Sequence, residues 1–173
     1  IGSFGIGMIY GASFGLIAVF GAKLGLSVFQ ISILVFVNTF IGALFQYPVG
    51  KLSDTFDRRI ILLILNIIAL ISSICVIIFG SFSFNILLLF VGIHSAVSLP
   101  YYAVVISHLN DFLEKDEVVS ASSTLTLVNA LGLVLGPIIV SGFMSYFDAY
   151  GLFYYCAIAV SYTHLRAHET TCD

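Results

Sequence analysis

The ten residues from Gly50 to Arg59 form a dense charge cluster, and ion pairing is the chemistry that their spacing allows. They hold three of the six Lys and Arg residues, between two apolar runs that are each long enough to cross a bilayer. Asp54 and Arg58 stand four positions apart, where opposite charges pair on a helix, and a carboxylate here also suits a helix amino terminus. Gly50 would let one backbone pass close to another. We therefore expect a tight polar loop between two membrane helices.

His94 is the titratable side chain that lies well inside an apolar run. Buried ionisable groups are expensive in membranes and are usually functional, and histidine titrates near neutral pH, which suits a proton relay. No acidic residue lies near it in the sequence, and a hydrogen-bonded structural histidine is the alternative interpretation. Both remain open.

Gly132 and Gly136 stand four apart and Pro137 follows directly. Small residues at this spacing let membrane helices approach closely, and a proline permits a kink. We expect this face to pack against another helix. Three amide side chains in apolar runs are expected to face a cavity or an interhelical seam, with structural hydrogen bonding favoured: Asn38, Gln46 and Asn129.

Motifs for covalent chemistry are missing from the sequence. The serines lack a nucleophile-elbow setting, no phosphate-cradling loop occurs, and no carboxylate pair sits within an apolar run. The cysteines at 75, 156 and 172 lack metal-ligand or disulfide-framework spacing. We predict no catalytic residues, no metal site, no cofactor and no nucleic-acid partner.

The elements that position these residues are membrane helices. The chain is 60% hydrophobic and 9% charged, whereas about a quarter of residues are charged in soluble proteins. A span needs about 20 apolar residues, so 173 positions hold about six helices and leave no room for a water-soluble domain. We predict an all-α integral membrane fold with six transmembrane helices at Ile1–Ala22, Ile31–Val49, Arg59–Gly80, Phe84–His108, Val118–Met144 and Phe147–Val160. The third is apolar on every face apart from Asn66 and Ser72–Ser73, which predicts a peripheral, lipid-facing helix without substrate contacts.

The distribution of Lys and Arg predicts the orientation. If the 50–59 segment is cytoplasmic, Lys51, Arg58, Arg59 and Lys115 lie on that side and only Lys23 lies opposite, as the positive-inside rule requires. The first helix then begins inside the cell.

The second cytoplasmic connection, from His108 to Glu117, is acidic. Asp111 and Glu114 are spaced like a capping box, and Asp116–Glu117 precede the fifth helix. Capping of helix starts and gating contacts with the basic cluster are equally good interpretations.

Both ends of the chain look cut. The chain starts at Ile1, and the last apolar run stops at Val160 after about 14 residues, fewer than a span needs. From Ser161 the pattern breaks and resembles translated sequencing-adaptor read-through, although a genuine polar tail is the alternative. We expect residues 1–160 to form one six-helix domain and residues 161–173 to be non-native, so that His164 and His168 are no metal site.

The 50–59 cluster resembles the signature between the second and third helices of each half of major facilitator superfamily transporters, roughly Gly-x-Leu-Ala/Ser-Asp-x-x-Gly/Asp-Arg-Arg/Lys. The matching residues are Gly50, Leu52, Ser53, Asp54, Asp57, Arg58 and Arg59. Further segments resemble the carboxy-terminal half of a bacterial branch: Gln46–Pro48, Leu99–Tyr101, His108–Asp111, Val119–Ser122 and Gly132–Pro137.

The resemblance implies a cytoplasmic latch at the matching residues and a central cavity lined by the first and fourth helices. The residues it places there are Tyr10, His94, Tyr101 and Tyr102. It also implies secondary active transport of a small organic or drug-like solute in the bacterial inner membrane, with protons as the candidate coupling ion and an amino-terminal half missing upstream. The Gly-Pro motif of antiporters is only partly matched, since Ile138–Ser141 follow the proline in place of paired glycines.

Two rival classes stay open. A membrane-embedded enzyme would need a polar cluster at one interface, for which His108 and Asp111 are the nearest candidates. A non-transporting scaffold or homodimer would require the chain to be complete.

Overall fold

The computed structural model describes the backbone of residues 2–114 and 117–169 and the side chains of residues 3–114 and 117–161. The predicted all-α membrane fold is confirmed. The described residues form six helices, α1 (Gly2–Lys23), α2 (Val28–Thr55), α3 (Arg58–Phe79), α4 (Phe84–Asn110), α5 (Val118–Tyr146) and α6 (Gly151–Glu169). By length and composition, α1 to α5 can each cross a bilayer, and the described part of α6 adds a shorter apolar stretch at Gly151–Ser161.

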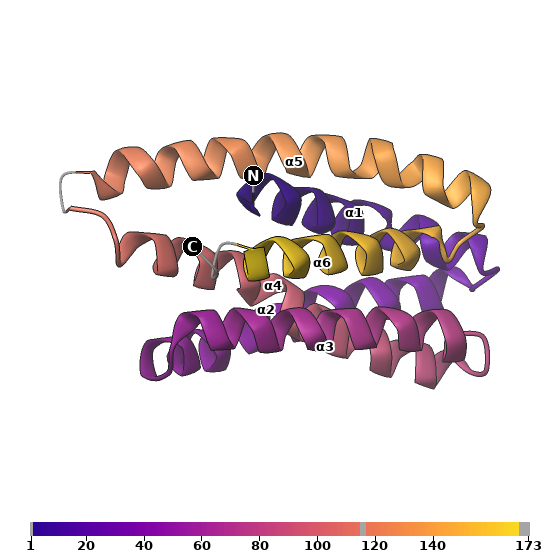
Figure 1. The fold of residues 1–173 in the computed structure, drawn as a ribbon. Coiled ribbons are helices and arrows are strands. Elements are labelled where there is room, and N and C mark those ends of the chain that lie inside the picture. The colour runs from indigo at the N-terminus through magenta and orange to yellow at the C-terminus, as the bar shows by residue number, and fades with distance from the viewer. Residues whose placement is uncertain (1, 115–116, 170–173) are drawn as a thin grey trace.

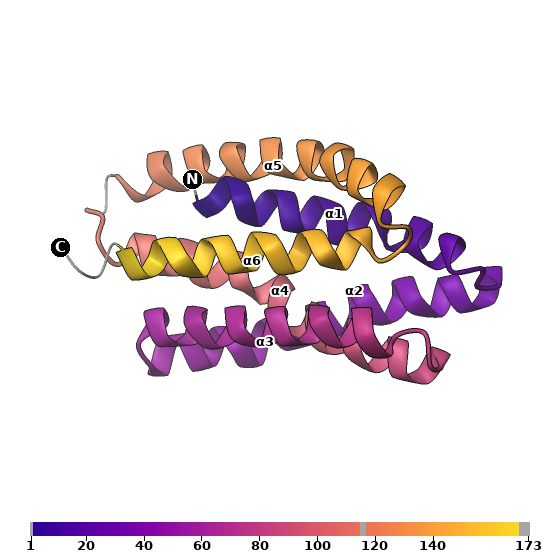
Figure 2. The same ribbon diagram turned by 45° about the vertical axis from the view of Figure 1, so that its right-hand side comes forward.

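The six helices run roughly parallel or antiparallel in one bundle (Figure 1). Helix α1 packs along α5, α2 packs along α4, and α3 lies against α4 and α6. Turning the view shows the same neighbours, with α5 and α1 on one side of α6 and α3 on the other (Figure 2). The alternation of direction brings the α2–α3 and α4–α5 connections to the same end of the bundle.

Local signals in the sequence explain where several helices begin. Ser27 and Gln30 form a capping box, in which the Gln30 backbone N–H donates to Ser27 Oγ at 3.3 Å and the Ser27 N–H donates to Gln30 Oε1 at 2.9 Å. Gly25 supplies the positive φ of 72° that the tight α1–α2 connection requires. Ser83 caps α4 by accepting from the Ile86 N–H at 3.3 Å.

The predicted second helix was too short, and this changes the nature of the charged cluster. Helix α2 continues past Val49 to Thr55, so only Phe56 and Asp57 connect it to α3. Lys51 to Thr55 contain no helix breaker, and two hydroxyls bond back to carbonyls of this last stretch: Ser53 Oγ to Gly50 O at 2.8 Å and Thr55 Oγ1 to Lys51 O at 2.9 Å. Most of the expected polar loop is therefore the helical end of α2.

The predicted sixth helix was wrong at both ends. It begins at Gly151 rather than Phe147, because Asp148 adopts a left-handed φ of 52° that ends one helix before the next can start. Its backbone continues to Glu169, past Val160. Losing the apolar pattern does not end a helix, and residues 161–169 contain neither Gly nor Pro.

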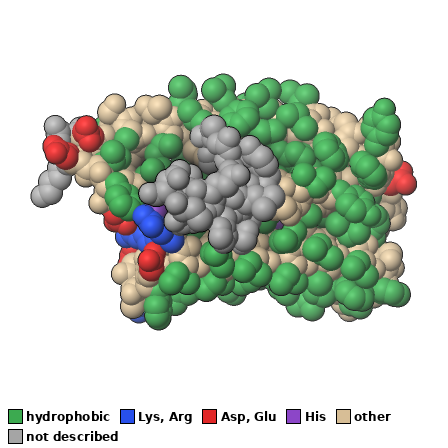
Figure 3. All heavy atoms as spheres, viewed as in Figure 1, with side chains coloured by type: hydrophobic (Ala, Val, Ile, Leu, Met, Phe, Trp, Pro, Cys, Tyr) green, Lys and Arg blue, Asp and Glu red, His purple; other side chains and the backbone are tan. Residues whose placement is uncertain are grey.

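The outer surface suits a membrane. Hydrophobic side chains are spread over the face seen in Figure 3, while charged ones gather near its ends. Helix α3 is the clearest example of this apolar surface. Its exposed side chains form an apolar stripe that includes Ile60, Leu63, Ile67, Ile71 and Ile78, all at least 40% exposed. The opposite side of α3 packs into the bundle through Ile61, Leu65, Ala69, Ser72, Ser73 and Val76. The predicted lipid-facing surface of α3 thus accounts for one side of the helix, and its other side is core.

Candidate functional site

Arg58 is the centre of the charged end of the bundle. Its guanidinium donates from Nη2 to Asp54 Oδ1 at 3.1 Å and from Nη1 to Asp111 Oδ1 at 3.0 Å, while Nε reaches the Ser53 carbonyl at 3.3 Å. Asp54 lies in the last turn of α2 and Asp111 is the C-cap of α4. One side chain of α3 therefore ties together the ends of three helices.

The degree of exposure fits a contact that can break and re-form. The Arg58 side chain is 20% exposed, whereas the side chains of Asp54 and Asp111 are 69% and 50% exposed. Carboxylates this open to solvent contribute only about 0.2–1 kcal/mol per pair, because water competes for them. The planar guanidinium can nevertheless serve both carboxylates at once.

The other residues of the 50–59 cluster make different contacts. Asp57 is the N-cap of α3 and accepts the Arg59 backbone N–H at 2.8 Å. Arg59 is exposed, with its guanidinium carbon 6.0 Å from the centroid of the Phe112 ring, and Leu52 is 47% exposed. The close backbone approach expected at Gly50 is not made within the described chain, because a Cβ added there would meet no atom within 4 Å.

In the acidic connection, the side chains of Asp111 and Glu117 do not cap the start of a helix. Asp111 ends α4 instead of starting a helix, and its carboxylate pairs with Arg58. Glu117 is the N-cap of α5 but makes no side-chain cap hydrogen bond. His108 lies edge-on to Phe112, with ring centroids 5.2 Å apart. Lys115 and Asp116 lie outside the described residues.

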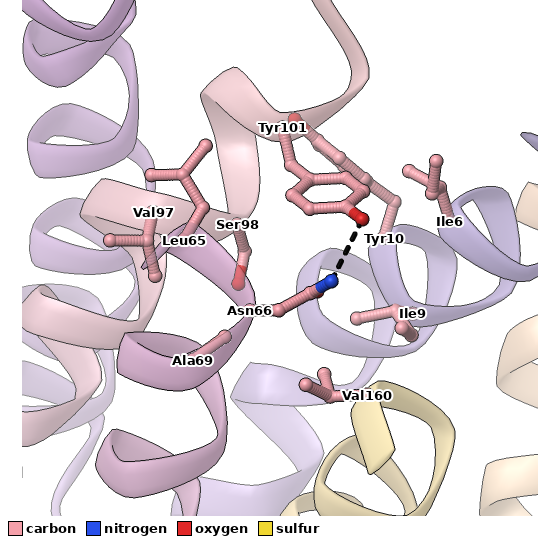
Figure 4. A pocket seen from close by; sticks show the side chains of 10 residues that line it. All are labelled: Ile6, Ile9, Tyr10, Leu65, Asn66, Ala69, Val97, Ser98, Tyr101 and Val160. Atoms are coloured by element: carbon pink, nitrogen blue, oxygen red, sulfur yellow. Dashed lines mark hydrogen bonds between the residues drawn. The ribbon is translucent and has the colours of Figure 1, made fainter. Parts of the chain in front are cut away.

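A second polar region lies inside the bundle, between α1, α3, α4 and α6. Two of the predicted cavity residues, Tyr10 and Tyr101, line a small pocket there (Figure 4). The Tyr10 hydroxyl donates to the carbonyl of Leu99, and Tyr101 Oη accepts from Asn66 Nδ2 at 3.0 Å. Asn66 was not among the predicted cavity residues, because its helix was expected to face lipid. An amide within an apolar run was the signal that could have singled it out.

His94 lies outside this pocket's lining, in the core between α3 and α4. Only 1% of it is exposed. Its ring contacts Ser73 Oγ at 3.2 Å, Ser72 Oγ at 3.4 Å and Ser98 Oγ at 3.3 Å, and it meets the Phe153 ring edge-on. Ser98, which was not among the predicted site residues, belongs both to this cluster and to the pocket lining.

The remaining candidates are dispersed. Tyr102 donates to Thr126 Oγ1 at 3.2 Å across the α4–α5 contact, and Gln46 is exposed on α2. Asn38 is buried and its Oδ1 accepts from Ser95 Oγ at 2.6 Å. Asn129 is buried and its Nδ2 donates to the Ser3 carbonyl at 3.1 Å. The latter two lie in interhelical seams.

The Gly-Pro segment faces α1 along a seam in which both helices contribute glycines. A Cβ added at Gly132 would overlap the Phe4 carbonyl oxygen, and one at Gly136 would overlap that of Met8. Conversely, side chains at Gly7 and Gly11 would overlap the carbonyls of Asn129 and Leu133. Pro137 lies beside Gly15, whose added Cβ would meet the proline Cγ at 3.2 Å. Backbone meets backbone here, as at small-residue crossings in membranes.

A bundle of apolar helices with a charged network at one end and a polar interior is the architecture of an integral membrane protein. The model of the Major Facilitator Superfamily matches residues 1–161, and the chain belongs to this family. The chain is 28% identical over 161 residues to the uncharacterized MFS-type transporter YfkF of Bacillus subtilis (strain 168), covering 92% of this chain and 40% of that protein. The chain thus spans well under half the length of this relative. No solved structure matches it.

Proposed function

We propose that the chain is the carboxy-terminal half of a secondary active transporter that moves a small organic or drug-like solute by alternating access. The observation that carries the proposal is the Arg58 network, because it occupies the family's signature segment and joins the ends of α2, α3 and α4. Contacts of this kind, partly exposed and shared among helix ends, can differ between inward-open and outward-open states at small energetic cost.

The proposal includes an orientation and a partner. The protein would lie in the inner membrane of a bacterium. The end that carries Lys51, Arg58 and Arg59 would be on the cytoplasmic side, with Lys23 at the opposite end. An amino-terminal half of the same protein would cover one side of this bundle and share the substrate site. Gly50 and Leu52, which pack on little within the chain, would then contact that half.

We further propose protons as the coupling ion, on the strength of His94. It is the titratable ring with hydrogen-bonding partners on both nitrogens in the centre of the described bundle. In membranes, such residues serve as proton relays or as structural polar groups. In the relay role, His94 would change its protonation state during the transport cycle.

Reading the flanking DNA is the first test. The proposal expects an upstream stretch that encodes about six further spans, each of about 20 apolar residues, and its own copy of the latch signature. A start codon directly at Ile1 would contradict it and would favour a scaffold or homodimer.

Transport by the full-length protein is the second test. Everted membrane vesicles would be loaded with a panel of labelled solutes and with ethidium, with and without an imposed pH gradient. Movement that depends on the gradient supports proton coupling. Equal movement under both conditions contradicts the proton proposal but not the transport proposal. Vesicles that contain the Arg58→Gln variant serve as the control, because their transport should be lower.

A further inference from the structure

The pocket between α1, α3, α4 and α6 is small, and its polar groups are few and close to one end. It encloses about 30 Å³, mostly between apolar side chains such as Ile9, Leu65 and Val97. The polar groups that reach it come from Asn66 on α3 and from Ser98 and Tyr101 on α4, and these side chains point toward one another (Figure 4).

The protons around His94 can be assigned from the hydrogen bonds of its neighbours. Ser72 Oγ and Ser73 Oγ both donate to the Ala69 carbonyl, at 3.0 Å and 2.8 Å. The Ala69 carbonyl oxygen also lies 3.4 Å from His94 Nδ1, and a carbonyl oxygen can only accept. These contacts favour the ring proton on Nδ1, beside that carbonyl and Ser73 Oγ, which leaves Nε2 of the neutral ring to accept from Ser98 at 3.3 Å.

This assignment leaves three unused hydrogen-bonding positions at the pocket. Ser98 Oγ has donated its proton to His94 and can accept. Tyr101 Oη accepts from Asn66 Nδ2, and its own proton finds no acceptor among the described side chains. The Asn66 amide oxygen likewise has no donor among them. The pocket thus presents one donor and two acceptors.

A water molecule matches this set. It can accept one hydrogen bond from Tyr101 and donate two, to Asn66 Oδ1 and Ser98 Oγ, which gives the three bonds that an internal water typically makes. A water needs at least about 10–15 Å³ of cavity, so the pocket has room for one or two. A solute the size of a sugar or a drug does not fit, and no carboxylate among the described residues lines the pocket to hold a cation.

We propose that this pocket is an internal hydration site and that its water links Ser98 to the Asn66–Tyr101 pair. The water completes a hydrogen-bonded chain from Tyr101 through Ser98 to His94, and Ser98 is the positioning residue that connects His94 to it. The Tyr10 hydroxyl, which also faces the pocket, is committed to the Leu99 carbonyl and stays outside the chain. The site stands independently of whether the protein transports protons.

Radiolytic footprinting tests the hydration site directly, because hydroxyl radicals form from water and label the aromatic side chains beside it. The full-length protein would be irradiated in detergent, and modification of each tyrosine measured by mass spectrometry. Tyr146, which is 91% exposed, reports bulk water, and Tyr155, which is 9% exposed, reports the dry core. We expect Tyr101 to be labelled several-fold faster than Tyr155. Equal, slow labelling of the two overturns the proposal.

A matched pair of variants separates bound water from bulk water that enters through the mouth of the pocket. Ser98→Thr and Ser98→Val have the same shape, but only threonine keeps the hydroxyl. We expect Tyr101 labelling to persist in Ser98→Thr and to fall several-fold in Ser98→Val, with Tyr146 unchanged in both. Equal labelling of Tyr101 in the two variants overturns the proposal. Asn66→Leu, which removes the second acceptor, should lower the labelling in the same way if Ser98→Val fails to fold.

Discussion

The charged end of α2, α3 and α4 and the glycine seam between α1 and α5 hold helices together by opposite means. At the charged end the helices meet through the long Arg58 side chain, which reaches two partly exposed carboxylates. Along the seam the backbones of α1 and α5 come into contact at Gly7, Gly11, Gly132 and Gly136. Side-chain contacts near water can exchange at little cost, whereas a backbone seam tolerates no added atom. We infer that α1 and α5 move as a unit and that conformational change is concentrated at the charged end.

The largest expected effect is at the seam. Gly136→Ala places a Cβ on the Met8 carbonyl oxygen, so α1 and α5 must separate along their length. Overpacking typically costs about 1–3 kcal/mol, and a rigid backbone contact should lie at the upper end of this range. Thermal unfolding of the purified full-length protein, followed by size-exclusion chromatography, measures the loss.

Gly142→Ala is the matched control for the seam. It lies on the same helix, but its added Cβ meets nothing within 4 Å. Its unfolding temperature should stay at or slightly above that of the parent, since alanine favours a helix over glycine. If both variants lose the same stability, the glycine seam has no special role in packing.

The second effect is at Arg58. Arg58→Gln removes both ion pairs and the contact with the Ser53 carbonyl, at a cost of about 1 kcal/mol in whichever state the network is formed. A shift of this size changes the ratio of two conformations about fivefold. The rate of transport into vesicles should therefore fall by a larger proportion than the unfolding temperature.

Arg59→Gln is the control for Arg58. It removes the same charge from the adjacent position, where the guanidinium makes no ion pair or side-chain hydrogen bond with the described residues and lies 6.0 Å from the centroid of the Phe112 ring. Transport by this variant should stay close to that of the parent. A loss as large as that of Arg58→Gln would mean that net charge, rather than the network, sets the conformational ratio.

The third effect is smaller and depends on salt. Asp54→Asn and Asp111→Asn each remove one partner of Arg58, and each should cost about 0.2–1 kcal/mol because the carboxylates are half or more exposed. Raising the salt concentration to 1 M shortens the screening length to about 3 Å and should shrink both effects. Unfolding curves of the two variants and of the double variant at low and high salt measure this. Equal costs at both salt concentrations would contradict ion pairing as the cause.

The smallest effect is at the far end of the seam. Lys23 Nζ donates to the Met144 carbonyl at 2.8 Å, so it joins the ends of α1 and α5 by a side chain, as Arg58 does elsewhere. Because Lys23 is exposed, water replaces this bond in Lys23→Gln, and the stability should change by about 0.5 kcal/mol or less. Thermal unfolding beside Gly136→Ala provides the measurement. A loss as large as that of Gly136→Ala would show that polar contacts, and not backbone packing, hold α1 to α5.

The sequence predicted the fold well where single segments decide it. The apolar runs gave six helices, and the starts of α4 and α5 were predicted correctly at Phe84 and Val118. The ends of α2 and α6 were missed for one reason: apolar content shows where a helix can be buried, whereas the backbone continues until a residue stops it. Neither Lys51–Thr55 nor residues 161–169 contain such a residue.

The candidate sites were predictable only in part. The spacing of Asp54 and Arg58 predicted their pairing, because four residues form one helical turn. The sequence left open whether the acidic connection caps helices or contacts the basic cluster, and it did not single out Asp111, 53 positions away from Arg58, as the second partner of that guanidinium. Likewise, Asn66 and Ser98 were single polar residues in separate apolar runs until the packing of α3 on α4 brought them to one pocket.

The sequence by itself determined that this is a helical membrane protein, which end of the bundle carries the charge and where two helices can approach closely. These properties follow from composition, spacing and residue size, all of which are local. The tertiary structure decided which helices meet, that Arg58 has its second carboxylate on α4, and that Ser98, which contacts His94, lines the same pocket as Tyr101. Those depend on contacts between distant segments, which the packing of the whole bundle sets.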